Sequence, residues 1–182
     1  MDLTFVSTNA GKFREVREIL ARYGVRVRWK RRALPEIQAT ALDQVVRAKL
    51  EAAAGLEDRV LVEDSGLFIP SLGGFPGIYS AYALDTIGLA GVLRLVEGRP
   101  HRAVFRTVAG VSIGGTRSMR AGECRGRIAD RPRGTHGFGY DPIFIPDGES
   151  RTFGQMKTAE KNAWSHRARA IDRIGRLLQR TE

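Results

Sequence analysis

The sequence has little of what marks secreted and membrane proteins. Its 182 residues include one cysteine, Cys124, which excludes an intramolecular disulfide and fits a reducing compartment. No apolar run approaches the ~20 residues that a membrane-spanning helix needs. The first residues also lack the charged-then-apolar order of a signal peptide. We therefore expect a cytoplasmic protein without a membrane partner.

Lysine is scarce as well. The chain has 30 basic residues and 20 acidic ones, a net charge of +10, and only five of the basic residues are lysines. Because this chain is so rich in arginine, each lysine indicates a position where a compact point charge, rather than a guanidinium, is needed. The positive balance fits a nucleic acid or a small polyanion such as a nucleotide. The cations are spread along the chain rather than gathered in a tail, which weighs against nucleic acid.

Length and periodicity predict one α/β domain covering residues 1–182. We expect a helix over about 13–23 with Glu15 on its outer face, and one final helix over about 161–180. Asp85 is expected to cap a helix. The predicted strands lie at 3–6, at 25–29 (antiparallel or at an edge), at 60–62, at 103–113 with a return strand reaching 128, and at 143–145.

Two polar turns follow predicted strands. Residues 7–12 join a strand to a helix, an arrangement that fits either a phosphate cradle or an ordinary helix cap. Glu63, Asp64 and Ser65 follow the apolar run 60–62, where they would form a metal-bearing site at the strand exit or a simple turn. Lys49 lies on the apolar face of the helix predicted over 41–54, so it either snorkels to water or meets a buried anion.

Five motifs in this order resemble the inosine triphosphate pyrophosphatase family over essentially the whole chain. The motifs are Ser7-Thr8-Asn9-Ala10-Gly11-Lys12, Val62-Glu63-Asp64-Ser65-Gly66-Leu67, Leu72-Gly73-Gly74-Phe75-Pro76-Gly77, Gly137-Phe138-Gly139-Tyr140-Asp141-Pro142, and Ala159-Glu160-Lys161-Asn162 with Ser165-His166-Arg167. The resemblance implies a mixed, strongly twisted central sheet flanked by helices, and two lobes with a long substrate cleft between them. It also implies a homodimer.

The resemblance implies hydrolysis of the non-canonical purine nucleotides ITP, dITP and XTP to the monophosphate and pyrophosphate, with Mg²⁺ as cofactor. Glu36 and Asp64 would hold the metal, and Asp64 would also orient or deprotonate the attacking water, with Glu63 in a supporting position. The substrate-binding residues that it implies are Ser7, Thr8, Asn9, Ala10, Gly11, Lys12, Lys49, Ser65, Phe138, Gly139, Tyr140, Asp141, Lys161, His166 and Arg167.

Base selection is expected in the C-terminal third. Phe138 would stack on the purine. Lys161 and Arg167 carry donors without acceptors, so they match the 6-oxo group of hypoxanthine or xanthine and not the 6-amino group of adenine. Two alternatives remain: a pyrophosphatase of modified or pyrimidine nucleotides, and a basic nucleic-acid-binding module.

Overall fold

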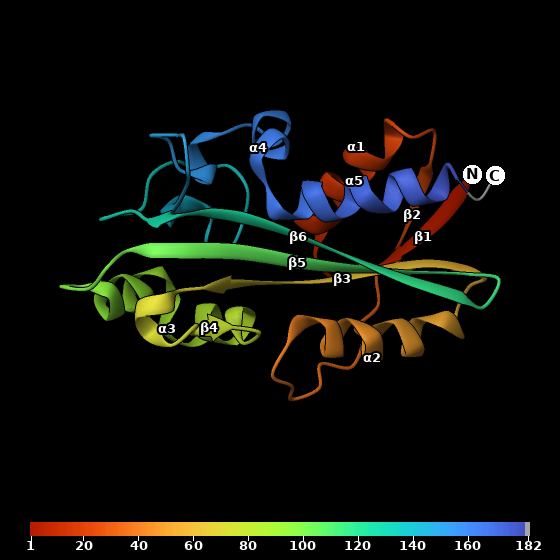
Figure 1. The fold of residues 1–182 in the computed structure, drawn as a ribbon, viewed down its shortest axis with the longest axis horizontal. Coiled ribbons are helices and arrows are strands. Elements are labelled where there is room, and N and C mark those ends of the chain that lie inside the picture. Colours follow the sequence, from red (N-terminus) through yellow and green to blue (C-terminus); the bar gives the residue numbers. More distant parts are fainter. Residues whose placement is uncertain (181–182) are drawn as a thin grey trace. The chain divides into compact units, whose positions relative to one another are not determined.

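The computed structural model describes residues 1–180 and has the expected mixed α/β fold (Figure 1). The strands are β1 Asp2–Val6, β2 Arg26–Lys30, β3 Arg59–Phe68, β4 Pro76–Gly77, β5 Arg102–Ile113, β6 Thr116–Ile128 and β7 Phe144–Pro146. The helices are α1 Ala10–Ala21, α2 Leu42–Ala54, α3 Ser80–Val96, α4 Thr158–Trp164 and α5 His166–Leu178. Within the described residues, no helix combines the length and the apolar character needed to cross a membrane.

The strands form one sheet in the order β2-β1-β3-β5-β6-β7, and β4 pairs with β3 beside this path. β1 is parallel to β2 and to β3, whereas the pairs β3–β4 and β6–β7 are antiparallel. β2 lies at the edge, as the sequence predicted. The antiparallel alternative for β2 is wrong, because α1 carries the chain back so that β2 starts at the same end as β1.

The chain divides into two compact units. Unit 1 contains residues 1–64, 107–122 and the described residues from Arg167 onward; unit 2 contains Ser65–Arg106 and Glu123–His166. The long strands β3, β5 and β6 contribute residues to both units. That residues 1–182 fold as a single domain stays a prediction.

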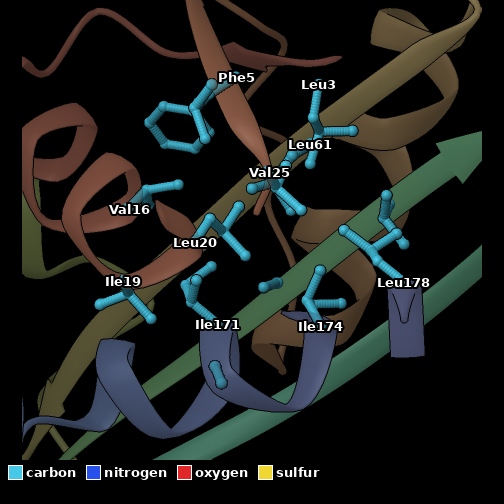
Figure 2. Close-up of a cluster of buried hydrophobic side chains, with 14 of the residues drawn as sticks. Leu3, Phe5, Val16, Ile19, Leu20, Val25, Leu61, Ile171, Ile174 and Leu178 are labelled. Atoms are coloured by element: carbon cyan, nitrogen blue, oxygen red, sulfur yellow. The ribbon is translucent and has the colours of Figure 1, made fainter. Parts of the chain in front are cut away.

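In unit 1, α1 and α5 cover one face of the sheet and α2 covers the other (Figure 1). Buried hydrophobic side chains form one layer on each face of the sheet. Figure 2 shows the layer in which strand side chains meet α1 and α5. Each such buried aliphatic or aromatic side chain stabilises the fold by roughly 1.5–3 kcal/mol. The labelled members of that layer are Leu3, Phe5, Val16, Ile19, Leu20, Val25, Leu61, Ile171, Ile174 and Leu178. The layer under α2 contains Val6, Val46, Leu50, Ala53, Val60 and Val62.

The core of unit 2 is built around aromatic rings. Phe105 of β5 and Phe144 make an edge contact, with ring centroids 4.6 Å apart, and Phe153 adjoins both. Val92 and Val96 of α3 belong to the same cluster. Offset and edge-to-face contacts of this kind add roughly 0.5–1.5 kcal/mol each beyond the area that they bury.

Three local expectations are corrected. The single final helix is wrong, because Ser165 has an extended backbone (φ −71°, ψ 149°) that ends α4 before α5 begins. Asp85 does not cap a helix, since α3 starts at Ser80 and is interrupted later, at Gly88 (φ 62°). Glu15 is buried rather than on the outer face of α1.

The tightest backbone approach beside β3 gives a testable prediction. A Cβ added to Gly66 would lie 2.3 Å from the carbonyl oxygen of Gly77, on the neighbouring strand β4. We expect Gly66→Ala to lower the free energy of unfolding by about 2 kcal/mol or more, because strand backbones would have to separate. The control is Gly55→Ala at the end of α2, where an added Cβ would have no such neighbouring atom within 4 Å and φ is −79°. Equal losses in denaturant unfolding of the two variants would contradict the prediction.

Candidate active site

The turn between β1 and α1 caps the helix and presents backbone N–H groups at its start. Asn9 is the N-cap, and its Oδ1 accepts a hydrogen bond from the Lys12 backbone N–H at 2.9 Å. Ser7 Oγ accepts one from the Asn9 N–H at 3.1 Å. Thr8 and Ala10 are exposed, and Gly11 lies in the first turn of α1. Because N–H groups of a first helical turn lack intrahelical acceptors, this turn satisfies the cap and still offers donors to an anion.

The carboxylates predicted at a strand exit lie inside a strand. β3 continues for ten residues, to Phe68, so the exit expected after residue 62 is wrong. Successive side chains of a strand point to opposite faces. Leu61 belongs to the core layer under α1 and α5, and Val60 and Val62 belong to the layer under α2. Glu63 therefore faces α1 and α5, whereas Asp64 faces α2.

Asp64 and Glu36 share one lysine. Lys49 Nζ of α2 donates to Asp64 Oδ1 at 2.6 Å and to Glu36 Oε1 at 3.0 Å. Lys49 is buried, so it meets a buried anion rather than snorkelling to water, while the Glu36 side chain is 71% exposed on its loop. Burial raises the pKa of the Asp64 carboxyl, and the charges of Lys12 and Lys49 oppose that rise. Burial would lower the pKa of the Lys49 ammonium, but Asp64 and Glu36 outweigh it and raise that pKa.

The donor set at this point fits Mg²⁺. Two carboxylates that reach the same ammonium are close enough to share a cation, and carboxylate oxygens are the ligands that Mg²⁺ prefers. Across residues 1–180 no group of three or more His, Cys, Asp or Glu side chains is arranged to hold a metal. The two carboxylates leave most positions around an ion open, which suits an ion that takes its other ligands from water and phosphate, as Mg²⁺ usually does.

On the other face of β3, Glu63 joins Lys12 to Arg167. Glu63 Oε1 lies 2.5 Å from Lys12 Nζ, and Glu63 Oε2 accepts from Arg167 Nε at 3.2 Å. Arg167 Nη1 also donates to Glu15 Oε2 at 2.5 Å. We call these four residues the Glu63 network. Sequence reasoning missed Glu15, although its place three residues after Lys12 on α1 puts both on one helical face.

In unit 2, Lys161 is enclosed by an acid and two rings. Lys161 Nζ donates to Asp141 Oδ2 at 2.6 Å, and the same oxygen accepts from the Phe138 N–H at 2.9 Å. The ammonium lies 4.8 Å from the Phe138 ring centroid and 5.5 Å from that of Phe153, within the range of cation–π attraction. Phe153 did not appear among the predicted residues, because nothing in its own surroundings in the sequence points to a ligand.

Other predicted residues of unit 2 take part in its packing. Tyr140 donates its hydroxyl to the Ser80 carbonyl at 2.8 Å, and burial with the nearby Asp85 charge raises its pKa to about 12. His166 is buried and stacks on Phe105 with centroids 4.4 Å apart. Ser65 is half-buried on β3, and Gly139 has a φ of 63°. Substrate contacts by these four residues stay predictions.

The predicted site residues thus form two groups, one in each unit. In unit 1, Lys12 of the turn and Arg167 meet at Glu63 on one face of β3, and Lys49, Asp64 and Glu36 meet on the other face. Unit 2 brings together Phe138, Asp141 and Lys161.

The chain matches known proteins over nearly its whole length. The model of the Ham1 family matches residues 3–176. The chain belongs to the Ham1 family. It is 47% identical over 173 residues to a dITP/XTP pyrophosphatase of Pyrococcus horikoshii, covering 94% of this chain and 93% of that one. It is 48% identical over 177 residues to a dITP/XTP pyrophosphatase of Methanopyrus kandleri, covering 96% and 94%.

Solved structures agree with the family assignment. The Ham1 protein of Staphylococcus aureus is 29% identical to this Ham1-family chain and superposes with a TM-score of 0.82, covering 98% of this chain and all of that one. The dITP/XTP pyrophosphatase of Mycobacterium abscessus is 27% identical, with a TM-score of 0.67, and covers 100% and 98%.

The buried pair in unit 2 gives a second prediction. Lys161→Met would leave the Asp141 carboxylate buried without the ammonium, and we expect it to cost about 3 kcal/mol of unfolding free energy. The control is Arg26→Met, which removes an equally short but exposed pair with Asp2 and should leave stability nearly unchanged. Chemical denaturation measures both. Similar midpoints for Lys161→Met and the wild type would show that the pair contributes little.

Proposed function

We propose that this Ham1-family protein hydrolyses the non-canonical purine nucleotides ITP, dITP and XTP to the nucleoside monophosphate and pyrophosphate, removing deaminated purines from the nucleotide pool. The observation that carries the proposal is the meeting of Asp64, Glu36 and Lys49 on the α2 face of β3, in the same unit as the turn at residues 7–12. The names of the curated relatives, dITP/XTP pyrophosphatases, support the substrate class.

The residues of unit 1 fit the requirements of phosphoryl chemistry. Lys12 and the N–H groups at the start of α1 would bind the triphosphate, because an anion is favoured at a helix N-terminus. Asp64 would orient the attacking water and accept its proton as the bond between the α- and β-phosphates breaks. Lys49 would hold the Asp64 carboxylate in a fixed orientation by its hydrogen bond and offset the negative charge of that carboxylate. Catalysis of this kind consists of positioning and charge stabilisation.

Magnesium is part of the proposal. Glu36 and Asp64 would hold Mg²⁺, whose charge would offset that of the phosphoryl oxygens and the leaving pyrophosphate. The arrangement that supports this assignment is the approach of both carboxylates to one cation, the Lys49 ammonium.

Lys161 and Phe138 of unit 2 are proposed to read the base. Lys161 is held by Asp141, so its ammonium has restricted freedom before a substrate arrives. A base contact by Arg167, which Glu15 and Glu63 hold in unit 1, stays a prediction. A donor fixed in this way donates to a 6-oxo group and is left unsatisfied by a 6-amino group, which is an effective source of discrimination.

We also propose a homodimer that forms through α3. Five of the seven large hydrophobic side chains exposed in residues 1–180 lie in the segment from Phe75 to Leu95, and Tyr82 is 70% exposed. The α3 helix carries only two charged residues, Asp85 and Arg94. Two copies of a chain with a charge of +10 repel each other, so a nearly neutral segment rich in tyrosine is the surface that favours self-association.

Cytoplasmic location is proposed on the basis of the nucleotide substrate.

The activity is tested with a panel of nucleotides and detection of pyrophosphate. We expect ITP, dITP and XTP to release pyrophosphate at similar rates, with ATP, GTP and pyrimidine triphosphates much slower, and EDTA to abolish the reaction because the metal is removed. Orthophosphate as the first product would refute the proposed reaction. A preference for a pyrimidine or modified nucleotide would move the protein to the alternative substrate class.

The matched variants for this panel are Asp64→Asn and Asp58→Asn. Asp64→Asn should remain folded and lose roughly 100-fold or more in kcat, because the amide neither accepts the proton nor holds a cation well. Asp58 is exposed just before β3, and the same substitution there should leave kcat unchanged.

Dimer formation is tested by light scattering on a sizing column. Tyr82→Glu would place two charges at the proposed interface and should convert the dimer to a monomer. Ile37→Glu introduces the same charge at an exposed apolar residue outside the segment and should leave the dimer intact. A wild-type monomer, or dissociation by Ile37→Glu alone, would refute the α3 interface.

A further inference from the structure

We infer that Glu63 is a positioning residue shared by Lys12 and Arg167, and that substrate phosphates displace it from Lys12 while it keeps its bond to Arg167. The inference rests on the proposed binding of a polyphosphate at the turn of residues 7–12. It assigns to Glu63 a task separate from that of its neighbour Asp64.

The pleat of β3 separates the two neighbouring carboxylates. Leu61 and Glu63 point toward α1 and α5, and Asp64 points toward α2. Asp64 accordingly pairs with Lys49 of α2, and Glu63 pairs with Lys12 of α1 and Arg167 of α5. Glu63 therefore acts on the side of the sheet where the phosphate-binding turn begins, not on the side of Glu36 and Asp64.

The two contacts of Glu63 differ in exposure. The Glu63 side chain is fully buried and that of Arg167 is 2% exposed, whereas that of Lys12 is 18% exposed. A buried carboxylate is costly without a cation, and Arg167 stays with Glu63 even if Lys12 moves. Lysine is a point charge on a flexible stem, so Lys12 is able to turn from Glu63 to a phosphate without moving the backbone.

Charge balance makes Glu63 a competitor of the substrate. The Glu63 network contains two cations and two carboxylates, so Lys12 is neutralised before a ligand arrives. An incoming phosphate competes with Glu63 for the charge of the Lys12 ammonium. Glu63 therefore holds Lys12 in place at the start of α1 and at the same time weakens the binding of any polyphosphate, including the pyrophosphate product. Weaker product binding favours release and further turnover.

The test measures the binding of inorganic tripolyphosphate by calorimetry in EDTA, so that neither metal nor base contributes. We expect Glu63→Gln to bind tripolyphosphate roughly fivefold or more tightly than the wild type, because the competing charge at Lys12 is removed. Lys12→Met should weaken binding, and Glu63→Gln combined with Lys12→Met should bind no more tightly than Lys12→Met alone. A structural role for Glu63 would not tighten binding of the anion.

The matched control is Glu57→Gln. Glu57 pairs with Lys30 at 2.9 Å in the same unit, partly exposed, and its substitution changes the net charge by the same amount. We expect no gain in tripolyphosphate affinity. An equal gain in Glu57→Gln, or unchanged or weaker binding in Glu63→Gln, would overturn the inference.

A second measurement uses the wild type, in case Glu63→Gln does not fold. With only five lysines, the NMR spectrum of the side-chain ammonium groups is sparse, and Lys12→Arg identifies the Lys12 signal. Tripolyphosphate should shift the Lys12 signal and leave the Arg167 Nε–H bonded to Glu63. A Lys12 signal that does not respond, or an Arg167 signal that is lost, would refute the exchange.

The outcome is independent of the proposed reaction. If the wild type releases pyrophosphate from XTP and Glu63→Gln shows no gain for tripolyphosphate, the role of Glu63 is refuted and the function stands. If no nucleotide is hydrolysed, the function fails, and the tripolyphosphate comparison still reports whether Glu63 competes for Lys12.

Discussion

Two successive carboxylates buried on one strand impose the main constraint on unit 1. Because neighbouring side chains of β3 point to opposite faces, Glu63 and Asp64 form their ion pairs with different cations, and a buried charge without a partner costs several kcal/mol. Each face supplies a cation for its own carboxylate. Lys12 and Arg167 meet Glu63, and Lys49 meets Asp64. The helices α1, α5 and α2 are positioned by these pairs as well as by their apolar layers.

The same principle holds in unit 2, where Lys161 is paired with Asp141 and covered by aromatic rings. Three of the five lysines thus sit in short ion pairs with buried carboxylates, at Lys12, Lys49 and Lys161. Cations held in this way keep a defined position before a ligand binds, so less side-chain conformational entropy is lost on binding. This arrangement agrees with the interpretation of the scarce lysines as places where a point charge is needed.

Periodicity predicted much of the local structure. The long hairpin, α2 with Lys49 inward, and the edge position of β2 all follow from side-chain patterns that a single segment contains. The errors occurred where a distant segment decides the outcome. Glu15 was expected in water because it lies off the apolar stripe of its helix, and it is buried because Arg167 meets it there. β3 was expected to end at its acids because the apolar run 60–62 is followed by polar residues and a glycine, and it continues because cations from α1, α2 and α5 meet those acids.

The sequence by itself determined most of the elements, the family resemblance and the residue types of the candidate site, because hydrophobic period, turn chemistry and motif order are local properties. Only the tertiary structure decided which charge meets which. The partners in the Glu63 network come from α1, β3 and α5, and up to 152 positions separate them along the chain. Such pairings depend on the face to which each strand and helix directs its side chains. Those directions are set only when the sheet and helices pack together.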